Sequence, residues 1–365
     1  MKNTTRISAI FLVLLMMLSA CSQSGNQSSN TAASNIVASN TPGSNTTNAN
    51  TSGSNSTDAD TQTGSGAKKG IMIIKQQGSF HNSSMGDGTM DQALEYDWEW
   101  EVGVPITHEN NDEQIQLIEQ AIANRVDGVL IMPAIVEGII PGIEKMEEAG
   151  IPFVNVNDEI PDLFSYNMAI GFVGASHYEN GYMQAKESIR IMEDVFGIRN
   201  GRVIIIEGTV GAESNTLRVQ AYHEVITESG WELVDQQPGN YNREMAFGVV
   251  QNLLQKYDDV DLYILASGTM VLGSSQAFEQ SGQDVKFSSH DIQPELMQLM
   301  CDNPNLICTI DTTPYETGKL AVKMLKDYFD GTLTEKYVVR PGTPTGRYCD
   351  NWQEYLEAYD MTFTG

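Results

Sequence analysis

The strongest constraint on the fold is an alternation, from Lys69 onward, of short apolar runs with amphipathic stretches of helical spacing. Runs that are apolar without interruption predict strands buried on both faces. Single helices between such strands predict parallel sheets covered by helices, so we expect an α/β fold. The predicted strands lie at residues 70–74, 128–132, 151–156, 202–206, 262–265 and 285–289.

The repeated strand–helix units form two groups that divide near residue 175. From Lys69 to the end there are about 300 residues, which is more than one ordinary domain and enough for two. We therefore expect two doubly wound lobes. Because open parallel sheets bind ligands beyond the carboxyl ends of their strands, polar residues that directly follow a strand are the candidate ligand contacts.

The beginning of the chain has the features of an export signal. Lys2 and Arg6 are positive, and the apolar residues 10–18 are fewer than the roughly 20 that a permanent membrane-spanning helix needs. The next residues, Leu-Ser-Ala-Cys, resemble the cleavage box of bacterial lipoproteins and end at Cys21. We expect residues 1–21 to be a lipoprotein signal peptide and Cys21 to carry the lipid. The alternative is an ordinary signal peptide with a chance cysteine.

Residues 22–66 have a composition that does not support a packed fold. Ser, Thr and Asn occupy 27 of these 45 positions. Such a segment buries too little apolar surface to offset the entropy cost of ordering it. We expect a disordered tether that holds the folded domain away from a membrane surface.

Charge and cysteine usage limit the possible partners. A formal net charge of −27 repels phosphate backbones and anionic lipid headgroups. We therefore expect no nucleic-acid partner and no membrane contact other than the lipid anchor. The spacing of Cys301, Cys308 and Cys349 matches no zinc pattern, and we expect no metal and no cofactor. A Cys301–Cys308 disulfide and buried free thiols are both compatible with the sequence.

A helix is predicted near the end of the domain by residues 313–316, Thr-Pro-Tyr-Glu. This sequence is typical of a capping box with proline at the first helical position. An apolar face follows, and Gly331 is expected to end the helix.

The order of these elements resembles the type-I periplasmic binding proteins, especially the ribose- and galactose-binding group, over residues 69–348. The resemblance implies two doubly wound parallel-sheet lobes joined by a three-segment hinge, with crossings near residues 175–176, 312–313 and 340–341. The N-terminal lobe would comprise residues 67–175 and 313–340, and the C-terminal lobe residues 176–312 and 341–365. The matching segments are residues 128–133 and 150–154, Glu207-Gly208 with Arg218, and Asn242-Arg243 with residues 251–254.

The resemblance implies two charged ligand contacts in the C-terminal lobe. Arg218 would donate to ring and hydroxyl oxygens, since its forked donors suit neighbouring oxygens; the alternative is a surface arginine in an ion pair. Asp291 would accept hydrogen bonds from ligand hydroxyls. The alternative role for Asp291 is the N-cap of a helix from Ile292 onward.

Further contacts are implied at other strand ends. Asn157 and Asp158 stand where the family carries Asp-Arg or Asn-Lys, so Asp158 reverses a charge; the alternative is a solvated pair in a loop. Ser267 replaces a family asparagine, and Thr312 replaces a glutamine or asparagine. Both replacements are weaker polar groups.

Aromatic groups are expected because the C–H faces of sugar rings stack on them. Tyr241 matches the family's stacking aromatic. Phe80 lies in the first loop with His81 and Asn82, and ordinary core packing is the alternative for Tyr241 and Phe80. His290 holds a phenylalanine position of the ribose type.

We expect an extracytoplasmic lipoprotein, anchored to the cell membrane and monomeric. It would capture a monosaccharide or related polyol by lobe closure and deliver it to the permease subunits of an ABC transporter. A receptor for a sugar, nucleoside or furanosyl signal that feeds a chemoreceptor or sensor kinase is equally compatible with the chain. We do not expect an enzyme, because no catalytic motif is present. A sugar-responsive repressor would require a DNA-binding module in place of the export signal.

Overall fold

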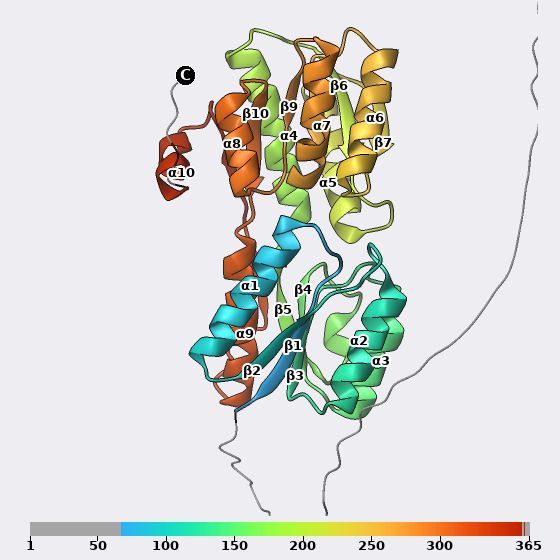
Figure 1. The fold of residues 1–365 in the computed structure, drawn as a ribbon, viewed down its shortest axis with the longest axis vertical. Coiled ribbons are helices and arrows are strands. Elements are labelled where there is room, and N and C mark those ends of the chain that lie inside the picture. Colours follow the sequence, from blue (N-terminus) through green and yellow to red (C-terminus); the bar gives the residue numbers. More distant parts are fainter. Residues whose placement is uncertain (1–66, 360, 362–365) are drawn as a thin grey trace, which may run out of the picture. The chain divides into compact units, whose positions relative to one another are not determined.

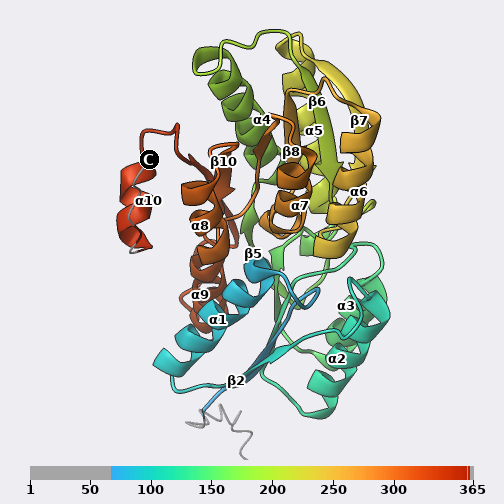
Figure 2. The ribbon, with the colours of Figure 1, turned by 45° about the horizontal axis from the view of Figure 1, so that its top comes forward.

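The computed structural model describes residues 67–359 and 361. The predicted signal peptide, Cys21 and the predicted tether lie outside the described residues. The described part contains two six-stranded sheets, each with helices packed against it (Figures 1 and 2). None of its helices combines the length and the apolar character needed to cross a membrane.

The first sheet and its helices form what we call the N-terminal lobe. Its strand order is β11-β5-β4-β3-β1-β2, and every pair is parallel. Helices α1 and α9 pack on one face, and α2 and α3 pack on the other. The strands are β1 (Lys69–Ile73), β2 (Glu99–Gly103), β3 (Gly128–Ile131), β4 (Phe153–Asn157), β5 (Ala169–Ala175) and β11 (Tyr337–Arg340). The helices are α1 (Phe80–Glu95), α2 (Asn111–Ala123), α3 (Ile140–Ala149) and α9 (Pro314–Phe329), with a short 3-10 helix η1 (Leu163–Ser165).

The second sheet and its helices form the C-terminal lobe. Its order is β12-β10-β9-β8-β6-β7, parallel except for the antiparallel pair of β12 with β10. Helix α4 packs beside α5, and α6 packs beside α7. The strands are β6 (Arg202–Glu207), β7 (Glu232–Pro238), β8 (Leu262–Leu265), β9 (Lys286–Ser288), β10 (Leu306–Asp311) and β12 (Thr343–Thr345). The helices are α4 (His177–Asp194), α5 (Glu213–Glu228), α6 (Arg243–Lys256), α7 (Gly268–Ser281), α8 (Pro294–Asp302) and α10 (Trp352–Ala358).

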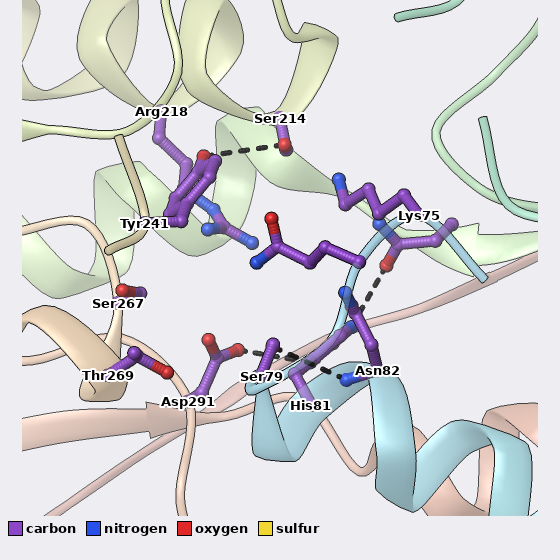
Figure 3. Close-up of a pocket in the computed structure, with 12 residues that line it drawn as sticks. Lys75, Ser79, His81, Asn82, Ser214, Arg218, Tyr241, Ser267, Thr269 and Asp291 are labelled. Atoms are coloured by element: carbon purple, nitrogen blue, oxygen red, sulfur yellow. Dashed lines mark hydrogen bonds and ion pairs between the residues drawn. The ribbon is translucent and has the colours of Figure 1, made fainter. Parts of the chain in front are cut away.

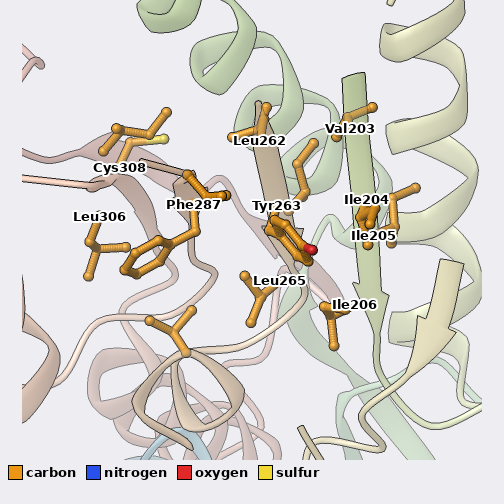
Figure 4. Close-up of a cluster of buried hydrophobic side chains, with 14 of the residues drawn as sticks. Val203, Ile204, Ile205, Ile206, Leu262, Tyr263, Leu265, Phe287, Leu306 and Cys308 are labelled. Carbon is orange, nitrogen blue, oxygen red and sulfur yellow. The ribbon is translucent and has the colours of Figure 1, made fainter. Parts of the chain in front are cut away.

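The central strands are buried on both faces, as their apolar runs predict. In β6 the four residues from Val203 to Ile206 are all 0% exposed (Figure 4). Burying an aliphatic side chain of this size contributes about 1.5–3 kcal/mol, so these strands are a main source of stability in the lobe. The expected fold class of two parallel-sheet α/β lobes is confirmed.

Helix α1 corrects an expectation. The sequence predicts helix only near Met90–Asp97 and a loop before it, whereas α1 already begins at Phe80 after its N-cap Ser79. The first half of α1 is polar and contains Gly86 and Gly88, so it shows no apolar period. Phe80, His81 and Asn82 therefore lie in the first helical turn and not in a loop.

The end of the domain brings one confirmation and one correction. Helix α9 has the predicted Pro314 in its first turn. The prediction of a capping box is wrong, because the N-cap residue Thr313 forms no capping hydrogen bond through its side chain. Thr313 has a left-handed backbone with φ 46°, and its buried hydroxyl has no hydrogen-bond partner among the described residues. An N-cap side chain requires an extended backbone to reach the first turn. The Asp311 carboxylate instead accepts a hydrogen bond from the Thr313 amide at 2.9 Å.

The cysteines in the described part are free thiols. Cys301, Cys308 and Cys349 form no disulfide with one another. Burial raises the pKa of the Cys308 thiol to about 12, so this thiol is protonated at neutral pH. Of the two alternatives that the sequence allows, the structure has the free thiols.

Candidate ligand-binding site

A pocket of about 360 Å³, counting the part open to solvent, lies where the carboxyl ends of the two sheets face each other. Side chains reach it from strand ends and helix N-termini of both lobes (Figure 3). The lining residues are Lys75, Gln76, Ser79, His81, Asn82, Asn157, Ser214, Arg218, Tyr241, Ser267, Thr269 and Asp291.

Arg218 enters the pocket from the second turn of α5. It is 5% exposed, which rules out a surface arginine. Its Nη1 donates to the Ala266 carbonyl oxygen at 3.0 Å, and no carboxylate of the described residues forms an ion pair with it. Burial lowers the pKa of Arg218. The nearby Tyr241 and Asp291 raise it by more, so the net shift of the Arg218 pKa is upward. The site therefore contains a buried cation with donors left for a ligand.

Asp291 faces the pocket from the loop after β9, with a left-handed backbone at φ 69°. Its Oδ1 lies 3.1 Å from His81 Nδ1 and accepts from the Thr312 hydroxyl at 3.3 Å. Burial raises the pKa of Asp291, but His81 and Arg218 hold it well below the usual range. The next helix begins at Pro294 with Gln293 as N-cap, so the alternative role of Asp291 as a helix cap is not observed.

His81 connects the two lobes across the pocket. It lies in the first turn of α1, and its Nε2 is 3.1 Å from the Asn157 side-chain oxygen. Its Nδ1 faces Asp291 of the C-terminal lobe and is 3.2 Å from the Thr312 hydroxyl. Both ring nitrogens are therefore held in place.

Lys75 and Asp158 form a buried ion pair at the end of β1. Lys75 Nζ lies 2.9 Å from Asp158 Oδ2, and the side chains are 6% and 2% exposed. The alternative of a solvated loop pair at residues 157–158 is therefore wrong. Burial raises the pKa of Asp158, but the Lys75 ammonium and the hydrogen bonds from Lys75 and Asn157 together outweigh burial and lower it, so Asp158 is ionised. Lys75 also lines the pocket, so the ion pair lies directly beside the candidate ligand site.

His177, at the start of α4, is a neutral histidine behind the pocket. Its Nε2 lies 2.9 Å from the Asn157 backbone oxygen and therefore donates to it, which leaves Nδ1 as an acceptor 3.5 Å from Arg218 Nη2. Burial lowers the pKa of His177 to about 3, in agreement with this tautomer.

A metal is not favoured at this position. Asp158, His177 and Glu213 have ligand atoms within 4.8 Å of one another, the one such group found among the described residues. The Lys75 ammonium already neutralises Asp158, and His177 Nε2 carries the proton that it donates. We assign no metal to these residues.

Tyr241 is the aromatic residue of the pocket lining. Its ring lies against Gly208, where an added Cβ would be 2.0 Å from the ring. Its hydroxyl donates to Ser214 Oγ at 3.4 Å. Ser267 caps α7 by accepting from the Met270 amide, so its hydroxyl proton remains free to donate.

Four predicted contacts do not line the pocket. Phe80 is 37% exposed and lines a neighbouring groove. Asp158 and Thr312 lie behind the lining, bound to Lys75 and Asp291. His290 is fully buried, with Nδ1 3.1 Å from Gln184 Oε1, because its side chain turns into the lobe.

The seven other predicted ligand contacts line the pocket, and their contact with a ligand stays a prediction. Sequence reasoning missed Lys75, Gln76, Ser79, Ser214 and Thr269. Lys75 and Gln76 directly follow the apolar run 70–74. Because polar residues directly after a strand are candidate ligand contacts, the sequence could have identified these two.

The lining contains buried polar atoms without partners among the described residues: Gln76 Oε1, Asn82 Nδ2 and Arg218 Nε. Leaving such a group unsatisfied costs about 1–3 kcal/mol, and more when it is charged. The set includes one acceptor and two donors. A ligand rich in hydroxyl groups would satisfy both kinds, because each hydroxyl donates and accepts.

Comparison of the sequence with known proteins identifies the protein family of this chain. Residues 70–333 match the periplasmic binding protein domain. The ribose import binding protein RbsB of Bacillus subtilis (strain 168) is 25% identical over 232 residues, which cover 64% of this chain and 72% of that protein. The D-allose-binding periplasmic protein of Escherichia coli (strain K12) is 25% identical over 217 residues, covering 59% and 69%.

The fold has solved counterparts. An ABC transporter solute-binding protein from Bacillus halodurans C-125, with bound myo-inositol, superposes with a TM-score of 0.72 at 23% identity. The match covers 81% of this chain and 99% of that protein. These relatives are solute-binding proteins and not enzymes, in agreement with the expectation from the sequence. The chain therefore belongs to the periplasmic binding protein domain family.

Proposed function

We propose that this protein is an extracytoplasmic receptor for a monosaccharide or related polyol. The observation that carries the proposal is the set of buried donors and acceptors without partners in the pocket, together with the buried pair Arg218 and Asp291. Arg218 offers a donor and Asp291 an acceptor, so neighbouring hydroxyls of one ring can bind both. The named relatives bind ribose and D-allose, which supports this ligand class.

We infer that the lobes, residues 67–175 with 313–340 and 176–312 with 341–365, rotate about three crossings and close on the ligand. The ligand would then pass to the permease of an ABC transporter, and the lipid on Cys21 would keep the receptor at the cell membrane.

Fractionation of cells expressing the parent and Cys21→Ala tests the lipid anchor. Membrane retention of the variant equal to that of the parent would contradict it.

Thermal-shift screening of the purified protein tests the ligand class. A ligand that binds only the folded state stabilises it by RT ln(1 + [L]/Kd), or about 2.7 kcal/mol at one hundred times Kd. We expect a rise in melting temperature with at least one of D-ribose, D-allose and myo-inositol. Stabilisation by amino acids or nucleosides, with none from sugars or polyols, would contradict the proposal.

A further inference from the structure

The N-terminus of α5 has no cap of its own. Its N-cap is Ala212, which has the extended backbone of a cap at φ −70° and ψ 137° but no side chain that can accept a hydrogen bond. The first amides of a helix have no partners within the helix. Here the Ser214 amide donates to Asp158 Oδ1 at 3.1 Å. A carboxylate of the N-terminal lobe thus caps a helix of the C-terminal lobe.

A second hydrogen bond runs in the opposite direction. Glu213, the first residue of α5, accepts through Oε2 from the backbone amide of Glu159. Each lobe therefore supplies one carboxylate to a backbone amide of the other lobe. In an ordinary capping box the same two reciprocal bonds lie within one helix terminus.

We propose that Asp158 and Glu213 form a capping box divided between the lobes, which is complete only when the lobes are in contact and which couples closure to the placement of Arg218. This inference rests on the proposed function. Asp158 and Glu213 are positioning residues, because neither lines the pocket.

The coupling follows from the neighbours of the box. On the N-terminal side, Asp158 is bound by two residues of the lining: Lys75 at 2.9 Å and the Asn157 side-chain amide at 2.6 Å. On the C-terminal side, α5 carries Ser214 and Arg218, which also line the pocket. A ligand that bridges the two sides would favour the completed box, and the box would hold both sides in place.

The box also makes closure sensitive to pH. Burial and the Asp158 carboxylate raise the pKa of Glu213 to about 7. Separation of the lobes would remove Asp158 and return Glu213 toward its ordinary pKa, so closure takes up a proton. The titratable groups that face Glu213 are Asp158, Glu159 and Tyr337 of the N-terminal lobe, Lys75 at the end of β1, and His177 at the start of α4.

The sign of the pH effect follows from the raised pKa. The contribution of Glu213 to closure is fully present below the ordinary glutamate pKa and is lost as the pH rises through 7. Ligand affinity should therefore fall by about tenfold between pH 5.5 and 7.5, since one proton contributes at most tenfold per pH unit.

The experiment is calorimetric titration at both pH values with whichever of D-ribose, D-allose and myo-inositol binds the parent protein. Glu213→Gln keeps an acceptor but cannot titrate, and it should lose the pH dependence between 5.5 and 7.5. Glu213→Ala should bind about fivefold more weakly at pH 5.5, equivalent to about 1 kcal/mol. The control Glu224→Gln, exposed on the same helix, should match the parent. A parent and Glu213→Gln with the same pH profile would overturn the proposal.

A second measurement separates a failure of the capping box from a failure of the proposed function, because it can be made with any ligand that binds the parent, whether or not that ligand is a sugar. Carbon-13 NMR of carboxyl-labelled glutamate follows the titration of Glu213 in the full chain with and without that ligand. We expect the midpoint to rise toward pH 7 when ligand closes the lobes of the parent, and to stay lower in ligand-bound Asp158→Asn. The same ordinary midpoint in both ligand-bound proteins would overturn the divided box.

Discussion

Arg218 is the residue whose removal should weaken ligand binding most. Hydrogen bonds to charged groups contribute about 1.5–3 kcal/mol, so Arg218→Ala should reduce affinity by about one to two powers of ten. Because Arg218 also donates to the buried Ala266 carbonyl, a small loss of stability should accompany the change. Calorimetric titration measures the affinity, with circular dichroism as the folding control. Arg202→Ala, at a partly exposed ion pair, should bind normally. Equal affinities in the two variants would contradict the role of Arg218.

The Lys75–Asp158 pair should matter for stability as well as for the site. Lys75→Met leaves a buried carboxylate without its cation, and such a change costs about 3–5 kcal/mol. Lys145→Met removes the exposed pair with Glu119, which should cost less than about 1 kcal/mol. Urea denaturation of both variants gives the comparison, and similar losses would show that the buried pair has no special role. Because the pair lowers the pKa of Asp158, its stabilisation is present at neutral pH and is lost only as the pH falls below the ordinary aspartate range.

At the residue scale, the family pattern selected two charged residues that the fold brings together, one in the second turn of α5 and one in the loop after β9. Arg218 and Asp291 were placed by the family pattern and reach one pocket. His290 directly precedes Asp291, but successive residues of a turn point in different directions, so it faces the interior. The burial of Lys75 depends on Asp158, 83 positions away in the sequence, and no local pattern reveals such a partner.

At the element scale, the packing of α1 on α9 depends on two glycines. A Cβ on Gly88 would lie 2.0 Å from the Tyr315 carbonyl oxygen, and one on Gly318 would lie 2.1 Å from that of Met85. The helices therefore approach through backbone contacts that a side chain would prevent. Gly86 and Gly88 weaken the helical pattern in the first half of α1, which explains why the start of this helix was not predicted.

Gly88→Ala should therefore destabilise the protein by about 1–3 kcal/mol, the usual cost of overpacking. It should also weaken ligand binding, because a shift of α1 moves His81. The matched control is Gly248→Ala in α6, where an added Cβ meets nothing within 4 Å. That change should be neutral or stabilise by up to about 1 kcal/mol, since alanine favours helix. Chemical denaturation of both variants tests this, and a stable Gly88→Ala would contradict the close approach.

At the scale of the whole molecule, several polar contacts join the lobes around the pocket. His81 faces Asp291, Asp158 accepts from the Ser214 amide, and His108 Nε2 lies 2.8 Å from the Asn240 carbonyl oxygen. A ligand can enter only if such contacts separate, so we expect rotation of the lobes about their crossings. Small-angle scattering should show a smaller radius of gyration with saturating ligand. An unchanged radius would indicate a static pocket.

The parallel strands and two-lobe architecture could be predicted because β1, β3, β6 and β8 are almost continuous apolar runs. The edge strands β2 and β11 have alternating exposure and were missed. The contacts between the lobes could not be predicted, since they join segments that the sequence separates widely and depend on the exact position of each loop.

The most direct test of the central claim is a crystal structure with the sugar or polyol that gives the largest thermal shift. We predict a ring between the lobes that contacts Arg218 and Asp291, lies against Tyr241, and satisfies Gln76 Oε1 and Asn82 Nδ2. A ligand bound elsewhere, or one that leaves Arg218 and Asp291 in contact with water alone, would contradict the account.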